Sequence, residues 1–117
     1  MMLGPDFTVD VCQVGAMAVV APHGEVDLAT VAAVRAALRS GEVSARVVLD
    51  LRQVEFMDSA GLALIVEQMR RADRDGFGFA VVRGSDQVQK LLHVAGLAER
   101  LVVLDDVPGA GDAGADS

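Results

Sequence analysis

The chain has 117 residues, which is enough for one domain with a single sizeable core and too few for two. Hydrophobic residues make up 52%, which excludes a disordered chain, and aromatic residues only 3%, so the base-stacking platforms of single-stranded nucleic-acid binders are missing. A net charge of −7 without a basic patch argues against nucleic acids and anionic membranes as partners.

The cysteine content and the first residues indicate the cellular location of the protein. The single cysteine, Cys12, cannot form an internal disulfide, and no Cys-x₂-Cys metal spacing occurs, so we expect neither a metal nor a cofactor. The first residues lack a basic start and an apolar run of signal length, and no segment approaches ~20 uninterrupted apolar residues. These features predict a cytoplasmic protein.

The first third of the chain predicts two strands and a helix. Residues 7–12 and 16–21 are predicted as strands, with a turn at 13–15. Asp27 is expected to cap a helix over residues 28–39, which Gly41 ends. The apolar stripe of that helix is Leu28, Val31, Val34 and Leu38.

The middle of the chain predicts a short apolar strand over 46–51, a loop over 52–58 and a long helix over 59–72. The helix carries its apolar side chains at helical spacing, at Leu62, Ile65, Val66, Met69 and Ala72. Its solvent face is predicted to hold Glu67, Gln68, Arg70 and Arg71.

A further strand, "FAVVRG", a helix capped by Ser85 and ended near Gly96, and a last strand, "RLVVLDD", complete the pattern. Residues 107–117 are rich in Gly, Ala and Asp, and are predicted to be a disordered acidic tail. Strands that alternate with helices of this length need crossover connections, so the sequence predicts an α/β domain with a parallel or mixed sheet.

Ser59 stands at the start of the long helix, in the segment "VEFMDSAGLALIVEQM", and three interpretations compete. In the first, Asp58 or Ser59 caps the helix and Gly61 allows close packing against a strand. In the second, Ser59 is a nucleophile with His23 or His93 as its base. Met57 opposes this, because it replaces the first glycine of the G-x-S-x-G elbow.

In the third interpretation Ser59 is a phosphoacceptor or the centre of a docking surface. A phosphate there would meet unpaired backbone N–H groups and the positive end of the helix dipole. The chain has no G-x-x-x-x-G-K-[ST] loop, so a kinase would have to be another protein.

Three segments resemble the STAS domain family, and within it the stand-alone anti-sigma factor antagonists. The segments are "GEVD" at 24–27, "VVLDLRQVEFMDSAGL" at 47–62 and "VQKLLHVAGLAERLVVLDD" at 88–106. The resemblance implies a STAS domain over residues 5–106, with a mixed four- to five-stranded sheet and helices packed mainly on one face.

The resemblance also implies a function that is not enzymatic. Such proteins bind an anti-sigma factor with serine kinase activity and free its sigma factor; the kinase phosphorylates the serine that maps onto Ser59, and a serine phosphatase resets it. Partner contacts are then expected around Gly24, Glu25, Asp27, Met57, Asp58, Ser59, Ala60 and Gly61.

Two departures from the family pattern stand out. Ala60 occupies a position where many relatives carry Ser or Thr, and the chain end has too few apolar residues for the additional helix that relatives often have. The alternative function is a STAS interaction subunit of a signalling scaffold or transporter assembly, without a phospho-switch. A small serine hydrolase is the third.

Overall fold

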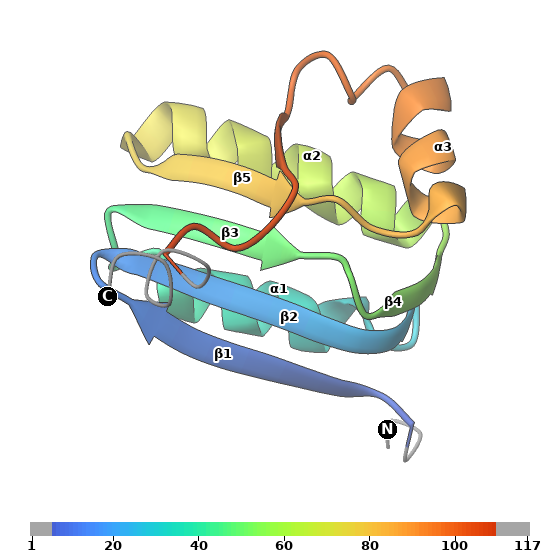
Figure 1. Cartoon of the computed structure of the whole chain (residues 1–117), viewed down its shortest axis with the longest axis horizontal. Coiled ribbons are helices and arrows are strands. Elements are labelled where there is room, and N and C mark those ends of the chain that lie inside the picture. Colours follow the sequence, from blue (N-terminus) through green and yellow to red (C-terminus); the bar gives the residue numbers. More distant parts are fainter. Residues whose placement is uncertain (1–5, 110–117) are drawn as a thin grey trace.

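The computed structural model describes residues 6–109 of the chain and builds them into six strands and three helices (Figure 1). The elements in chain order are β1 (Thr8–Val14), β2 (Met17–Val26), α1 (Val31–Gly41), β3 (Arg46–Asp50), β4 (Val54–Met57), α2 (Ser59–Asp75), β5 (Gly78–Val82), α3 (Asp86–Val94) and β6 (Val102–Leu104).

The sheet is mixed, as predicted. Its strand order is β1-β2-β3-β5-β6, and β4 pairs with β2 off this path. Only the β1–β2 hairpin is antiparallel, with Gly15 in its turn at a φ of 60°. The first half of β2 pairs with β3, and its last residues, Gly24–Val26, pair with β4. The long strand β2 therefore carries the "GEVD" segment to the end of β4.

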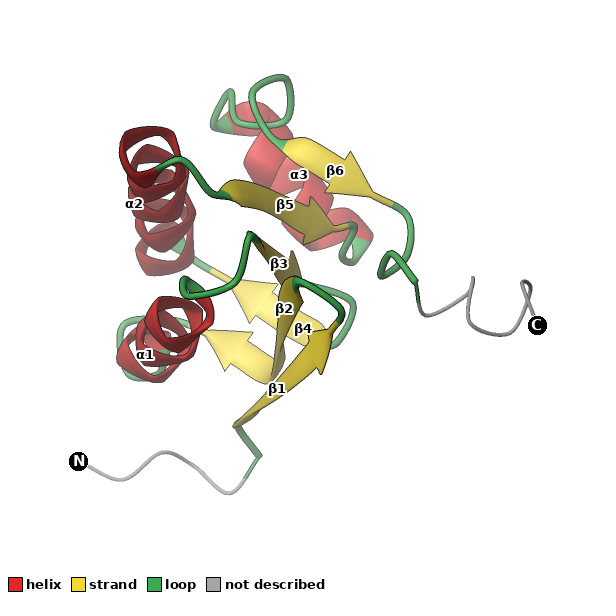
Figure 2. Ribbon diagram, turned by 90° about the vertical axis from the view of Figure 1, so that its left-hand side faces the viewer, coloured by secondary structure: helices red, strands yellow, loops and turns green. Residues whose placement is uncertain are grey.

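Helices α1 and α2 cover one face of this sheet (Figure 2). The main core lies between the two layers and is built largely from Val and Leu, and the chain has no Trp or Tyr to add to it. Val34 and Leu38 of α1 and Leu64 and Ile65 of α2 are at most 1% exposed. The prediction of helices packed mainly on one face is confirmed.

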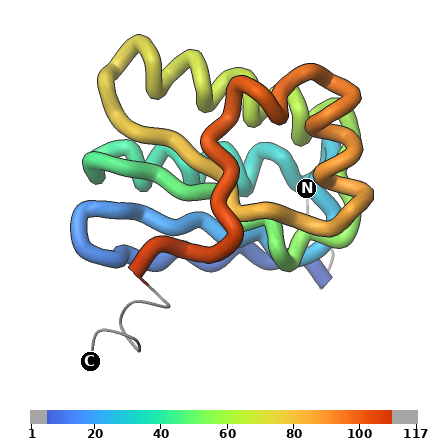
Figure 3. Tube along the Cα trace, turned by 45° about the horizontal axis from the view of Figure 1, so that its top comes forward, coloured from blue at the N-terminus to red at the C-terminus, as the bar shows by residue number. Residues whose placement is uncertain are grey.

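The chain segment that follows β6 covers part of the opposite face of the sheet (Figure 3). Val107 is 7% exposed and packs on Met17, Val19, Val48 and Val82. The packed core therefore extends to Val107, one residue beyond the predicted domain end at Asp106. The rest of the predicted tail, residues 110–117, lies outside the described residues.

Two predictions about elements were wrong. The loop predicted over 52–58 contains β4, which was missed because its burial pattern, buried–exposed–exposed–buried, does not alternate as a half-buried strand does. The sheet thus has six strands in the described residues and not four or five.

Leu28 was also misplaced on the apolar stripe of the first helix. It lies in a turn before α1 and is 83% exposed, because the helix begins only at Val31. The helical spacing runs back into the turn by chance, and sequence periodicity alone does not show where a helix begins.

Candidate functional site

Asp58, and not Ser59, caps helix α2. The Asp58 backbone is extended and its Oδ1 accepts a hydrogen bond of 2.9 Å from the Ala60 N–H. Its carbonyl oxygen accepts from the N–H groups of Gly61 and Leu62, at 3.1 and 3.2 Å. Ser59 is the first helical residue, and its side chain is exposed to solvent. The structure thus assigns the cap to Asp58 and leaves the Ser59 hydroxyl out of it.

Gly61 fits tightly against the strand that precedes the helix. Both Gly61 and Met57 are buried. A Cβ atom on Gly61 would overlap Met57 Cγ and lie 2.9 Å from its sulfur atom. The prediction that Gly61 allows close packing against a strand is confirmed, and the strand is β4.

The "GEVD" segment lies directly beside the start of α2. In the parallel pairing of β2 with β4, Glu25 is opposite Phe56 and Val26 is opposite Met57 (Figure 2). The Asp58 N–H donates to the Val26 carbonyl oxygen at 3.3 Å. Two segments some 30 residues apart in the sequence thus form one surface, with Ser59 at its edge.

Asp27 has a structural role in the turn between β2 and α1. Its Oδ1 accepts from the N–H groups of Ala29 and Thr30, at 2.9 and 3.2 Å. The Thr30 hydroxyl donates to the Glu25 carbonyl oxygen at 2.7 Å and accepts from the Asp27 N–H at 3.0 Å. These bonds fix the turn, while the Glu25 side chain stays exposed.

The predicted partner-binding residues separate into two groups. Gly24, Met57 and Gly61 are buried, so they lie beneath the surface that the ends of β2 and β4 form. Glu25 and Ser59 are exposed, and Asp27, Asp58 and Ala60 are partly exposed.

Neither histidine supports a nucleophilic Ser59. His23 Nε2 pairs with Asp10 Oδ2 at 2.9 Å on the β1–β2 hairpin, and His93 is an exposed residue of α3. Within residues 6–109 neither ring hydrogen-bonds to Ser59, and no group of three or more His, Cys, Asp or Glu residues could hold a metal ion.

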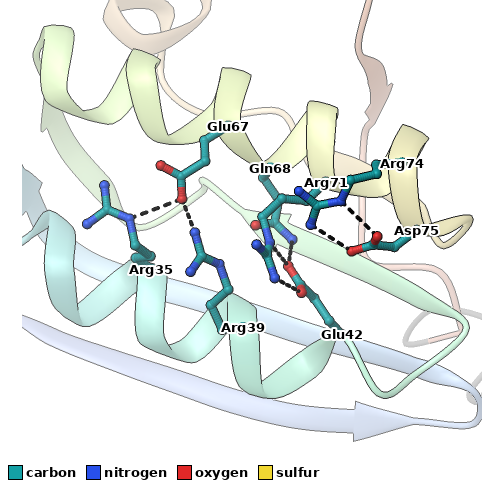
Figure 4. A network of polar contacts seen from close by, with 8 residues as sticks. All are labelled: Arg35, Arg39, Glu42, Glu67, Gln68, Arg71, Arg74 and Asp75. Carbon is teal, nitrogen blue, oxygen red and sulfur yellow. Dashed lines mark hydrogen bonds and ion pairs between the residues drawn. The ribbon is translucent and has the colours of Figure 1, made fainter.

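A polar network that the sequence analysis missed joins α1 to α2 (Figure 4). Glu42, just after α1, accepts two hydrogen bonds from Arg71, at 2.7 and 2.8 Å, and one from Gln68 Nε2, at 2.8 Å. The Arg71 guanidinium holds the pKa of the Glu42 carboxyl below its usual value. One turn away, Glu67 pairs with Arg35 and Arg39.

This network corrects the prediction that Gln68 faces solvent. Gln68 is 0% exposed and sits between the helices, because Glu42 satisfies its amide nitrogen there. The two helices are therefore held in one relative position, and α2 in turn positions Ser59.

A second ion-pair group holds the segment after β6. Asp50, which is buried, accepts from Arg52 Nε and Nη2 at 3.0 and 2.9 Å, and Arg52 Nη1 donates to Asp106 Oδ1 at 2.8 Å. Arg83 pairs with Asp105 at 3.2 Å. These contacts precede Val107, which packs in the apolar cluster on the sheet.

Comparison of the sequence with protein families and with known proteins identifies the family. A family model described as the STAS domain matches residues 8–110. The anti-sigma-F factor antagonist RsfB of Mycobacterium tuberculosis is 35% identical over 101 residues, which cover 82% of this chain and 80% of that protein.

Solved structures show the same fold. The crystal structure of an anti-sigma factor antagonist from Mycobacterium paratuberculosis has a TM-score of 0.80 at 26% identity, covering 96% of this chain and 97% of that one. The Bacillus cell fate determinant SpoIIAA in its phosphorylated form has a TM-score of 0.65 at 19% identity, covering 86% of this chain and 92% of that one.

Among residues 6–109, none of the helices has the length and the apolar character that a membrane span requires.

Proposed function

The chain belongs to the STAS domain family, and from that premise we propose that it is an anti-sigma factor antagonist that phosphorylation of Ser59 switches off. In its unmodified form it binds an anti-sigma factor of the serine kinase type and so releases the sigma factor. A serine phosphatase removes the phosphate. The 35% identity to RsfB over most of both chains supports the antagonist assignment.

The position of Ser59 is the observation that supports the proposed phosphorylation switch. Its side chain is exposed at the first residue of α2, and the capping bond is made by the residue before it, Asp58. Ser59 can therefore be modified without loss of the cap. It also borders the surface that the ends of β2 and β4 form together.

The phosphate is expected to act on the partner contact and not on the fold. It adds about −1.5 to −2 charges at the positive end of a helix dipole, where an anion is worth roughly 0.3–1 kcal/mol of stabilisation. In a protein interface the same group is bulky and must lose water, at an effective cost of several kcal/mol. Even a loss of ~2 kcal/mol lowers affinity about 30-fold.

The experiment uses the full chain and its cognate anti-sigma factor. We expect ATP and the kinase to phosphorylate the protein at Ser59 only, which peptide mass spectrometry would show. Calorimetric titration should give normal binding for Ser59→Ala and binding at least 10-fold weaker for Ser59→Asp. Both variants should keep the melting temperature of the wild type.

Ser85 offers a matched control, since it is an exposed serine at the start of another helix, α3. Ser85→Asp keeps a capping side chain and should bind normally. If Ser59→Asp and authentic phosphoserine at 59 both bind as tightly as the wild type, the switch is wrong. The interaction subunit without a phospho-switch would then be the better assignment.

A further inference from the structure

Two large apolar side chains are exposed where β2 and β4 end. Leu28, in the turn before α1, is 83% exposed, and Phe56, on β4, is 42% exposed. Single exposed apolar residues are common on protein surfaces and need no explanation. These two differ from such residues by their place, because Phe56 lies on β4, which leads to Ser59, and Leu28 follows β2, which pairs with β4.

The strand register and the turn place both residues at the same end of β2. Phe56 is paired with Glu25 across β2 and β4, so their side chains leave the sheet on the same side. The turn that carries Leu28 folds back onto the same strand end, because the Thr30 hydroxyl donates to the Glu25 carbonyl oxygen. Ser59 lies two residues after the end of β4, and the Asp58 N–H donates to the Val26 carbonyl oxygen.

Two exposed acidic residues lie on the strands that carry or adjoin this apolar pair. Glu25 and Glu55 are exposed, and neither forms an ion pair with a residue that the structure describes. Both also line a hollow with Asp27. The rest of the chain adds to this field, since its net charge is −7.

We propose that Leu28 and Phe56 are the apolar anchors of the docking surface, with Glu25 and Glu55 as its rim, and that they fit a protein surface with an apolar socket flanked by Arg or Lys. This inference rests on the proposed function for the identity of the partner, an anti-sigma factor. Interfaces commonly have such an apolar centre and a polar rim, and aromatic and large aliphatic anchors contribute most to affinity.

Other occupants of the surface fit less well. Nucleic acids and anionic membranes would meet an acidic rim and be repelled. A second copy docked about a two-fold axis would set Glu25 and Glu55 against the same carboxylates. A basic partner is the one that the charges favour.

The surface also gives the switch a physical basis. A phosphate on Ser59 would place a strongly hydrated group at the border of an apolar contact, where it has to lose water or hold the two surfaces apart. Because the proposed partner carries Arg or Lys beside its socket, the phosphate weakens binding only if its bulk and its loss of water at the apolar contact outweigh its attraction to those basic side chains.

The test is photo-crosslinking in the native cell, with the full chain carrying benzoylphenylalanine at position 28 or 43. Position 43 is the matched control, because Val43 is 94% exposed but precedes β3, whose first residue pairs with the opposite end of β2 from Glu25. Capture of one partner at 28 and not at 43 is expected, with the crosslinked peptide next to an Arg or Lys.

Charge reversal completes the design. Glu25→Lys with Glu55→Lys should lower capture at position 28 at least 10-fold, while Glu99→Lys, at another exposed acidic residue, should not change it. Leu28→Ser should lower the affinity for the captured partner about 10- to 30-fold at an unchanged melting temperature, and Val43→Ser should not.

The outcomes separate this inference from the proposed function. A captured protein that meets these conditions but is not an anti-sigma factor supports the surface and contradicts the function. Equal capture at both positions, no capture at 28, capture of a second copy, or insensitivity to the double charge reversal would overturn the surface.

Discussion

Gly61→Ala tests how the structure holds Ser59 in place. The added methyl group would overlap Met57 Cγ and lie 2.9 Å from Met57 Sδ and 3.3 Å from Cε. Met57 cannot move aside easily, because it is 2% exposed and its backbone belongs to β4, which is paired with β2. The clash must be relieved by a shift of the Met57 side chain or of the first turn of α2.

Two opposing terms set the size of the effect. Alanine is favoured over glycine in a helix interior by about 1 kcal/mol, and by less in the first turn, where Gly61 lies. Overpacking a dense core costs roughly 1–3 kcal/mol. We therefore expect Gly61→Ala to lower the free energy of unfolding by about 1 kcal/mol, and to slow phosphorylation of Ser59.

A double-mutant cycle measured by urea unfolding identifies the cause. Met57→Ala alone should cost about 2–5 kcal/mol, because it leaves a cavity. In the Gly61→Ala background it should cost at least ~1 kcal/mol less, since the new methyl group then has room. Gly15→Ala is the control: Gly15 has a φ of 60° and a methyl group added there would meet no atom within 4 Å, so its effect should add to that of Met57→Ala. Additivity of Gly61→Ala with Met57→Ala, or a stabilising Gly61→Ala, would refute the steric explanation.

Three further predictions concern the cap, the helix contact and the chain end. Asp58→Ala should lower the free energy of unfolding by roughly 1 kcal/mol and slow phosphorylation of Ser59; a normal rate would argue against a positioning role. The pKa of Glu42 is lowered by Arg71, so its contribution is fully present above the unfolded-state pKa, near 4.5, and is lost as pH falls through the lower folded-state pKa. Urea midpoints should therefore show Glu42→Gln less stable than the wild type at pH 7 and the gap closing in acid; a gap independent of pH would contradict this. Val107→Ala should cost about 1–2 kcal/mol in the same assay, at ~0.8 kcal/mol per buried methyl-sized group, and no loss would mean that this segment does not pack on the sheet.

Much of the fold could be predicted because its helices carry strong periodic signals. The apolar stripe from Leu62 to Ala72 correctly predicted that this segment is a helix, α2. The alternation of strands and helices predicted the mixed sheet. Ser59 was singled out by its place before that stripe. Local patterns of this kind depend only on neighbours in the sequence.

What escaped prediction depends on contacts between distant residues. Strand β4 exists because Val54–Met57 pair with the end of β2, which no local pattern shows. Gln68 is buried because Glu42, 26 residues earlier, accepts a hydrogen bond from its side-chain amide nitrogen. Leu28 is exposed because hydrogen bonds of Thr30 hold the preceding residues in a turn, so that α1 begins only at Val31. The role of a polar residue on an apolar helix face, or of an apolar residue outside that face, can be assigned only when the residue that it contacts is known.

These long-range contacts also constrain how a switch at Ser59 works. The start of α2 is held by the Asp58 cap and by Gly61 against Met57, and its later turns are held to α1 through Glu42 and Arg71. A phosphate at the positive end of that helix relieves no strain and breaks none of these bonds. A modification can shift a conformational equilibrium only by its different interaction with the two states, and no contact of Ser59 in this fold provides such a difference. The phosphate is therefore expected to act through the partner that touches it, at the docking surface that we propose beside Ser59.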